Sequence, residues 1–330
     1  MDIKQQDGLQ RWICGADEMN IGLIDVDGHN FPNIPLMKLS AYHKKLGDHV
    51  EFYNPLWSGH MDRVYMSKVF SFTPDYPYFI DADEVIKGGT GYAVTIEDGK
   101  EKYDPEKDMK LPHEVEHIFP DYSLYPDLCK DTAYGFMTRG CPRHCKFCVV
   151  GDKEGTRTIT VAPLSEFWDG QKYIELLDPN PLAAREWKDN LAQLAASGAY
   201  VNFNQGVDIR LMTEEKAEAL KKVKVKAVHF AWDRYEEKEM IIPKLKMFKD
   251  VTGWVRQKMT VYVLTNFDTT FEQDVERVYT LRDMGFSPDV RIYEKYRLPK
   301  GDRLIKFQRY VNNKRVFNTC KSFDDYWRKK

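Results

Sequence analysis

Three of the six cysteines in this chain, Cys141, Cys145 and Cys148, fall within eight residues. Thiolates at C-x3-C-x2-C spacing on a tight loop can converge on one soft metal centre. Gly140 and Pro142 favour a bent backbone here over a regular helix. The other cysteines stand singly, and we expect each of them to be a buried thiol: Cys14, Cys129 and Cys320.

The composition of the chain limits its possible partners, compartment and number of domains. The chain has 330 residues with 49 Lys or Arg against 51 Asp or Glu, so its overall charge gives no reason to expect nucleic-acid or membrane binding. No apolar run approaches the length of a membrane span, and the first residues do not resemble a secretion signal. Six cysteines are too few for a disulfide scaffold in a chain of this size. We therefore expect a cytoplasmic protein of one or two domains with no membrane partner.

Two metal groups are compatible with the clustered cysteines. A 4Fe-4S cluster is usually held by four cysteines, so three would leave one iron open to an outside ligand. A structural zinc site is the alternative, with His144 as the fourth ligand. The adjacent side chains of His144 and Cys145 would have difficulty reaching one tetrahedral ion together.

The stretch 137–148, Met-Thr-Arg-Gly-Cys-Pro-Arg-His-Cys-Lys-Phe-Cys, resembles the cluster loop of radical S-adenosylmethionine (SAM) enzymes, including the aromatic Phe147 before the last cysteine. The resemblance implies an oxygen-sensitive enzyme in which SAM binds the open iron of a 4Fe-4S cluster. It also implies a reducing electron donor of the flavodoxin or ferredoxin type. The radical formed from SAM would take a hydrogen atom from a substrate that the sequence does not identify, and no catalytic residue is assigned.

Strand-like and helix-like segments alternate after the cysteines, which predicts an α/β fold. We expect strands at 134–138, 172–177, 200–203, 226–232, 259–266 and 289–293, and helices at 185–197, 214–223, 235–250 and 270–284. The family resemblance implies that these six units, within residues 126–300, form a partial (β/α)6 TIM-like barrel. A flat doubly wound sheet is the rival arrangement.

Active residues of such a barrel collect at the carboxyl ends of its strands. Relatives carry a glycine and glutamate motif for the SAM amino group after the second strand, where this chain has Asp178 instead. A solvated loop residue or a helix cap is the alternative role for each candidate. The candidates for binding SAM are Phe147, Asp178, Gln205, Asp208, Arg210, Asp233 and Asn266.

Residues 1–125 predict a small Rossmann-like α/β domain, with strands at 21–27, 50–53, 62–70 and 85–86 and a helix at 34–46. This order resembles the N-terminal domain of cobalamin-binding radical SAM proteins. Asp27 and His29 partly match the loop that places a histidine on cobalt, but Pro32 replaces the required glycine. A cobalamin-dependent methylase is therefore an alternative, although we favour a reduced domain that covers or docks substrate.

Residues 113–117 satisfy H-E-x-x-H, the pattern of zinc proteases. That chemistry needs a substantial helix, and Pro112 and Pro120 leave room for hardly two turns. We therefore interpret the segment as a linker.

The segment from Arg291 to Lys330 holds 13 Lys or Arg against 4 Asp or Glu, with eight aromatic residues among them. Such a segment can bind nucleic acid, and a non-catalytic metal-binding or nucleic-acid-binding protein is the third functional alternative. Residues 303–317 also have the pattern of one amphipathic helix, with Leu304, Phe307, Tyr310, Val311 and Phe317 inward. We favour a helix in 301–330 that closes the barrel.

Overall fold

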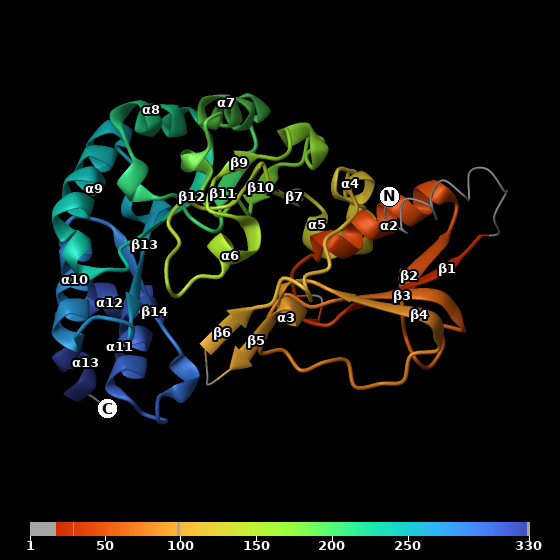
Figure 1. The fold of residues 1–330 in the computed structure, drawn as a ribbon. Helices are drawn as coiled ribbons and strands as arrows, with labels where there is room; N and C mark the ends of the chain where they lie inside the picture. The colour runs from red at the N-terminus through yellow and green to blue at the C-terminus, as the bar shows by residue number, and fades with distance from the viewer. Residues whose placement is uncertain (1–17, 29, 98–99, 329–330) are drawn as a thin grey trace. The chain divides into compact units, whose positions relative to one another are not determined.

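The computed structural model describes residues 18–28, 30–97 and 100–328. The chain forms two compact units, Met1–Gly135 with Ser165–Gln171, and Phe136–Leu164 with Lys172–Lys330. Both contain parallel strands and helices, so the fold is α/β, as predicted (Figure 1).

The first unit contains a four-stranded parallel sheet with the strand order β2-β1-β3-β4. Helix α2 (Ile34–Leu46) connects β1 to β2, whereas the described chain has no helix between β2 and β3 or between β3 and β4. All four predicted strands are present, as β1 (Asn20–Asp25), β2 (His49–Phe52), β3 (Met61–Ser67) and β4 (Ala82–Gly88).

Helix α2 begins and ends where its sequence predicts. The Asn33 side chain accepts a hydrogen bond from the Leu36 amide at 3.3 Å and so caps the first turn. Gly47 ends the helix with a φ of 89°, a left-handed conformation that glycine adopts without strain. The helix buries Leu36 and Leu39 in a cluster with Ile21 and Leu23 of β1.

Asp27, in the segment that partly matches a cobalt-binding loop, contacts the chain after β3. Its carboxylate accepts hydrogen bonds from the Val69 amide at 2.5 Å and the Thr73 hydroxyl at 2.6 Å. Asp27 therefore holds the loop after β3. His29 lies outside the described residues.

The H-E-x-x-H segment forms a single turn, α4 (His113–Glu116). His117 directs its Nδ1 at Glu166 Oε1, 2.9 Å away. A single turn agrees with the predicted linker. The other small elements of this unit are α3 (Thr90–Ala93), β5 (Val94–Glu97), β6 (Lys100–Tyr103) and α5 (Pro126–Cys129).

A six-stranded sheet follows, with the order β14-β13-β12-β11-β10-β7. Each strand from β10 to β13 pairs in parallel with the next one along the chain. The strands are β7 (Thr132–Gly135), β10 (Tyr173–Leu176), β11 (Tyr200–Phe203), β12 (Val225–Ala231), β13 (Met259–Thr265) and β14 (Ser287–Ile292).

Four helices alternate with these strands and lie in an arc along one face of the sheet (Figure 1). They are α7 (Trp187–Ser197), α8 (Glu214–Lys222), α9 (Lys238–Thr252) and α10 (Phe271–Asp283). Thr213 caps α8 through the Lys216 amide, as predicted. Within the described chain, no helix has the length and apolar character needed to cross a membrane.

The predicted first strand, 134–138, is wrong in its bounds. The chain leaves β7 at Gly135, and residues Thr138–Arg139 form β8, which pairs with the antiparallel β9 (Ile159–Thr160). The amides of Met137 and of Thr138, the first residue of β8, donate to Asp178.

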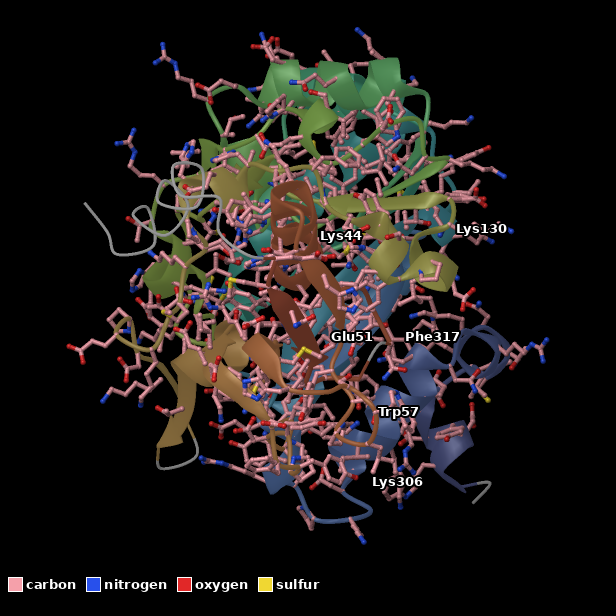
Figure 2. All side chains as sticks on the ribbon, turned by 90° about the vertical axis from the view of Figure 1, so that its right-hand side faces the viewer. Lys44, Glu51, Trp57, Lys130, Lys306 and Phe317 are labelled. Carbon is pink, nitrogen blue, oxygen red and sulfur yellow. The ribbon has the colours of Figure 1, made fainter. Side chains whose placement is uncertain are left out.

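The prediction of one C-terminal helix over 303–317 is also wrong, because Asn313 divides it. Helix α11 (Arg303–Asn312) ends there, and the Asn313 side chain caps α12 (Lys314–Thr319), which α13 (Phe323–Arg328) follows. The predicted inward face is otherwise present: Phe307, Tyr310, Val311 and Phe317 are buried, and Leu304 is half-buried. Figure 2 marks Lys306 on α11 and Phe317 on α12.

The segment packs on the end of the sheet. Asn312 accepts a hydrogen bond from the Val290 amide of β14 at 2.8 Å, and Gln308 donates to the Val290 carbonyl at 2.9 Å. These bonds place α11 against the last strand.

Among the singly placed cysteines, Cys129 is buried, as predicted. Cys320 is only half-buried, because it lies between α12 and α13 near the chain end, so the prediction for it is wrong. Cys14 lies outside the described residues.

A buried arginine of α10 connects the ends of β12 and β13. Arg277 of α10 is fully buried and binds Asp274 Oδ1 at 2.5 Å. Its guanidinium also donates to the carbonyl oxygens of Trp232 and Asp233 after β12, at 2.6 and 2.9 Å, and of Leu264 in β13, at 2.7 Å. Arg277 therefore fixes the point where both strands enter their loops.

We expect Arg277→Met to lower the free energy of unfolding by about 4 kcal/mol, because it leaves the Asp274 carboxylate buried without its cation. Urea unfolding measures this loss. The double variant Asp274→Leu/Arg277→Met should recover part of it, since neither charge is then buried alone. A loss below about 1 kcal/mol in the single variant would contradict the assigned role.

Candidate functional site

The cysteine loop, residues 140–148, is bent and tied at both ends. Gly140 has a φ of 83°, and a Cβ atom there would lie 2.2 Å from the Arg157 carbonyl oxygen, so glycine is required. The Cys141 amide donates to the Gly155 carbonyl at 3.1 Å, just after α6 (Val150–Glu154). The Cys148 amide donates to the Cys145 carbonyl at 2.9 Å. The loop therefore has the tight backbone that its sequence predicts.

The Cys145 thiol is half-buried, as is that of Cys141, whereas Cys148 is exposed. Burial raises the pKa of the Cys145 thiol to about 11, the charge of Arg210 lowers it, and Asp233, Cys148 and Cys141 raise it. The thiols of Cys141 and Cys148 are therefore close enough to Cys145 to affect its pKa. No group of three His, Cys, Asp or Glu side chains in the described residues is arranged to hold a single metal ion.

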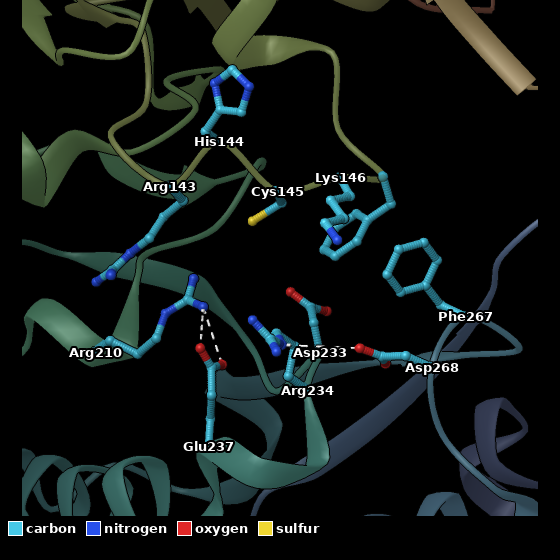
Figure 3. A pocket seen from close by; sticks show the side chains of 11 residues that line it. Arg143, His144, Cys145, Lys146, Arg210, Asp233, Arg234, Glu237, Phe267 and Asp268 are labelled. Carbon is cyan, nitrogen blue, oxygen red and sulfur yellow. Dashed lines mark hydrogen bonds and ion pairs between the residues drawn. The ribbon is translucent and has the colours of Figure 1, made fainter.

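His144 and Cys145 point to opposite sides of the loop (Figure 3). His144 has a φ of 45°, is exposed, and directs Nε2 toward Asp152 Oδ1, 3.7 Å away. The structure does not bring His144 together with the cysteine thiols, so the ligand set of the zinc alternative is not assembled.

Asp178 holds the chain just before the cysteine loop. It is 2% exposed and accepts hydrogen bonds from the amides of Met137 and Thr138, both at 2.8 Å, and from the Thr138 hydroxyl at 2.6 Å. Burial raises the pKa of this carboxyl to about 7, although the three hydrogen bonds act in the opposite direction. Both carboxylate oxygens are engaged with the chain, which places Asp178 as a support of the loop.

A cavity of about 470 Å³ opens beside the cysteine loop. Cys145 and the Asp233 carboxylate point into it in Figure 3. The other walls come from the loops after β11, β12 and β13, at the carboxyl ends of these strands. The lining residues are Arg143, His144, Cys145, Lys146, Phe147, Arg210, Asp233, Arg234, Glu237, Phe267 and Asp268.

A charged network forms one wall. Asp208 binds Arg210 Nε at 2.7 Å through one oxygen and Arg143 Nε at 2.5 Å through the other. Arg210 Nη1 lies 3.1 Å from both oxygens of Glu237. Burial alone would raise the pKa of Asp208, but its bonds to Arg210 and Arg143 outweigh burial and lower it. Asp208 therefore stays ionised and orients both arginines.

Asp233 differs from Asp208 because its carboxylate makes no hydrogen bond with the described residues. Burial raises its pKa to about 6, the charges of Arg210 and Arg277 lower it, and those of Glu237 and Asp208 raise it. The cavity thus contains one carboxylate that is available to a cationic ligand group.

Aromatic side chains form the opposite wall. The rings of Phe147 and Phe267 meet edge to face with centroids 5.3 Å apart, and Phe267 contacts Tyr293 in the same way at 5.0 Å. This wall combines a residue of the cysteine loop with one from the loop after β13.

Four of the predicted SAM-binding residues meet around this cavity: Phe147, Arg210 and Asp233 line it, and Asp208 binds the lining arginines. Asn266, Gln205 and Asp178 are not among the lining residues. Asn266 is exposed and donates to the Tyr293 carbonyl at 2.9 Å, and Gln205 is exposed after β11.

Sequence reasoning missed several lining residues. Phe267 and Asp268 directly follow Asn266, whose left-handed φ of 64° turns the chain so that its two successors line the cavity. Arg143 and Lys146 lie between the cysteines of the motif, and this position alone could have predicted that they line the cavity. Glu237 directly precedes α9 and carries no such signal.

No protein-family model matches this chain, and no curated protein matches it. Among solved structures, the crystal structure of Streptococcus suis SuiB bound to S-adenosylmethionine is similar at 14% sequence identity and a TM-score of 0.37. The match covers 66% of this chain and 52% of SuiB, so the chain matches about half of that protein's length. We draw no family assignment from a similarity of this size.

We expect Asp208→Asn to lower the free energy of unfolding by about 2 kcal/mol at neutral pH, because it removes the charge that pairs with two arginines. The folded-state pKa of Asp208 is lowered, so its contribution is complete above the unfolded pKa of about 3.9 and is lost as pH falls through the folded value. Thermal unfolding measured from pH 7 down to about pH 2 should therefore show a difference from wild type that is constant above the unfolded pKa and shrinks below it. The exposed Asp250→Asn is the control, and a difference that does not depend on pH would contradict this account.

Proposed function

We propose that this chain is a radical SAM enzyme that removes a hydrogen atom from an unidentified substrate. The observation that carries the proposal is the position of the C-x3-C-x2-C loop. It stands beside a cavity lined by residues that follow parallel strands, with Cys145 among the lining side chains. The strand order of the six-stranded sheet follows the chain, which is what an open (β/α)6 barrel requires.

The residues present fit a 4Fe-4S cluster. The donor set consists of three thiols on one bent loop, and thiolates are the usual ligands of such clusters. Each thiol would bind a different iron, so Cys141, Cys145 and Cys148 need not meet at one point. When bound, the cluster supplies the electron that cleaves SAM to give the 5'-deoxyadenosyl radical.

The cavity has side chains suited to SAM, which carries a carboxylate, an amino group and a sulfonium. We assign the Asp233 carboxylate to the cationic part of SAM, because no described residue pairs with it. Arg210, held in place by Asp208 and Glu237, is assigned to the SAM carboxylate. The Phe147 and Phe267 rings offer an apolar wall for the adenine.

Anaerobic reconstitution of the full chain with iron and sulfide tests the cluster. We expect about four irons per chain and a broad visible absorbance in the wild type. Cys145→Ala should lose most of both, because it removes a ligand at the cavity. Cys320→Ala is the matched control and should keep them.

A colourless protein that binds zinc, or a Cys145→Ala variant with full iron content, would contradict the proposal. Adding hydroxocobalamin to the same reconstitution and recording its spectrum tests the methylase alternative.

A further inference from the structure

Asn180 is a buried amide that follows β10 and lies next to the cysteine loop. It is 2% exposed and stands between Pro179 and Pro181, whose rings restrict the backbone on both sides. Two residues earlier, Asp178 holds Met137 and Thr138. The short segment 178–180 thus contacts the chain at the start of the cysteine loop twice.

The contact of Asn180 is with a sulfur atom. Its Nδ2 donates to Cys141 Sγ at 3.5 Å, while its Oδ1 is buried and has no hydrogen-bond partner among the described residues. A buried amide with one unsatisfied atom costs folding free energy. Stability therefore does not explain why an asparagine occupies this position, whereas a donor aimed at a cluster ligand does.

We propose that Asn180 raises the reduction potential of the cluster by donating this hydrogen bond to the Cys141 sulfur. The proposal rests on the proposed function, because it requires a cluster on the cysteine loop. The reduced cluster carries one more negative charge than the oxidised one, and part of this charge lies on the cysteine sulfurs. An N–H donor stabilises that charge and so favours reduction.

Burial strengthens the effect. The Asn180 amide is 2% exposed and Cys141 is half-buried, so the donor lies in surroundings of low dielectric, where a dipole acts more strongly on a nearby charge. Asn180 does not line the cavity, so it is a positioning and tuning residue and not a contact of the substrate.

The test compares midpoint potentials of the full chain after anaerobic reconstitution, measured by a redox titration followed by electron paramagnetic resonance. Asn180→Leu keeps the branched side chain of four heavy atoms and removes the donor. Asn180→Ala removes the donor without adding apolar bulk, and it serves if the leucine variant does not fold. Asn190→Leu is the matched control, because Asn190 is a buried asparagine of α7 that donates to the Thr160 hydroxyl at 3.0 Å.

We expect both Asn180 variants to load iron as the wild type does and to have a more negative midpoint potential, while Asn190→Leu keeps the wild-type potential. An unchanged potential in a fully loaded Asn180 variant would overturn the inference but not the proposed function. An equal shift in Asn190→Leu would also overturn it, because the effect would then reflect packing. Failure of the wild type to load a cluster would overturn both proposals.

Discussion

The buried carboxylate of Asp178 is the constraint on which the candidate site depends most. It accepts hydrogen bonds from the amides of Met137 and Thr138, where the chain passes from β7 to β8 just before the cysteines. The chain then turns at Gly140, where the approach of the Arg157 carbonyl admits only a glycine. These two local requirements, one polar and one steric, determine where the three thiols stand.

The second requirement of the site is that the charged side chains of the cavity are held in fixed positions. Four cationic and three acidic side chains line the cavity, not counting His144 and Cys145. Asp208 and Glu237 hold Arg210 between them, whereas the side-chain carboxylate of Asp233 makes no hydrogen bond with the described residues. A cavity with oriented cations and one available carboxylate suits a ligand that carries both signs of charge.

The sequence was sufficient for the strands and most helices because these follow from apolar periodicity and capping residues. Strand β11 has the predicted bounds, β12 is shifted from its predicted bounds by one residue at both ends, and β13 ends one residue earlier than predicted. The roles of Asp178 and Asn266 could not be predicted, since a carboxylate or amide after a strand can turn to the cavity or to the backbone. That choice depends on which amides and carbonyls the folded chain leaves within reach. Asn313 is a similar case, because its cap divides a helix that amphipathic spacing alone would continue.

The central claim is that this chain cleaves SAM by one-electron reduction at a cluster on Cys141, Cys145 and Cys148. The most direct measurement is the amount of 5'-deoxyadenosine formed when SAM and dithionite are added to the reconstituted protein without oxygen. We predict that the wild type forms it and that Cys145→Ala does not. A wild-type protein that carries its cluster and binds SAM, but forms no 5'-deoxyadenosine above the level of Cys145→Ala, would contradict the account.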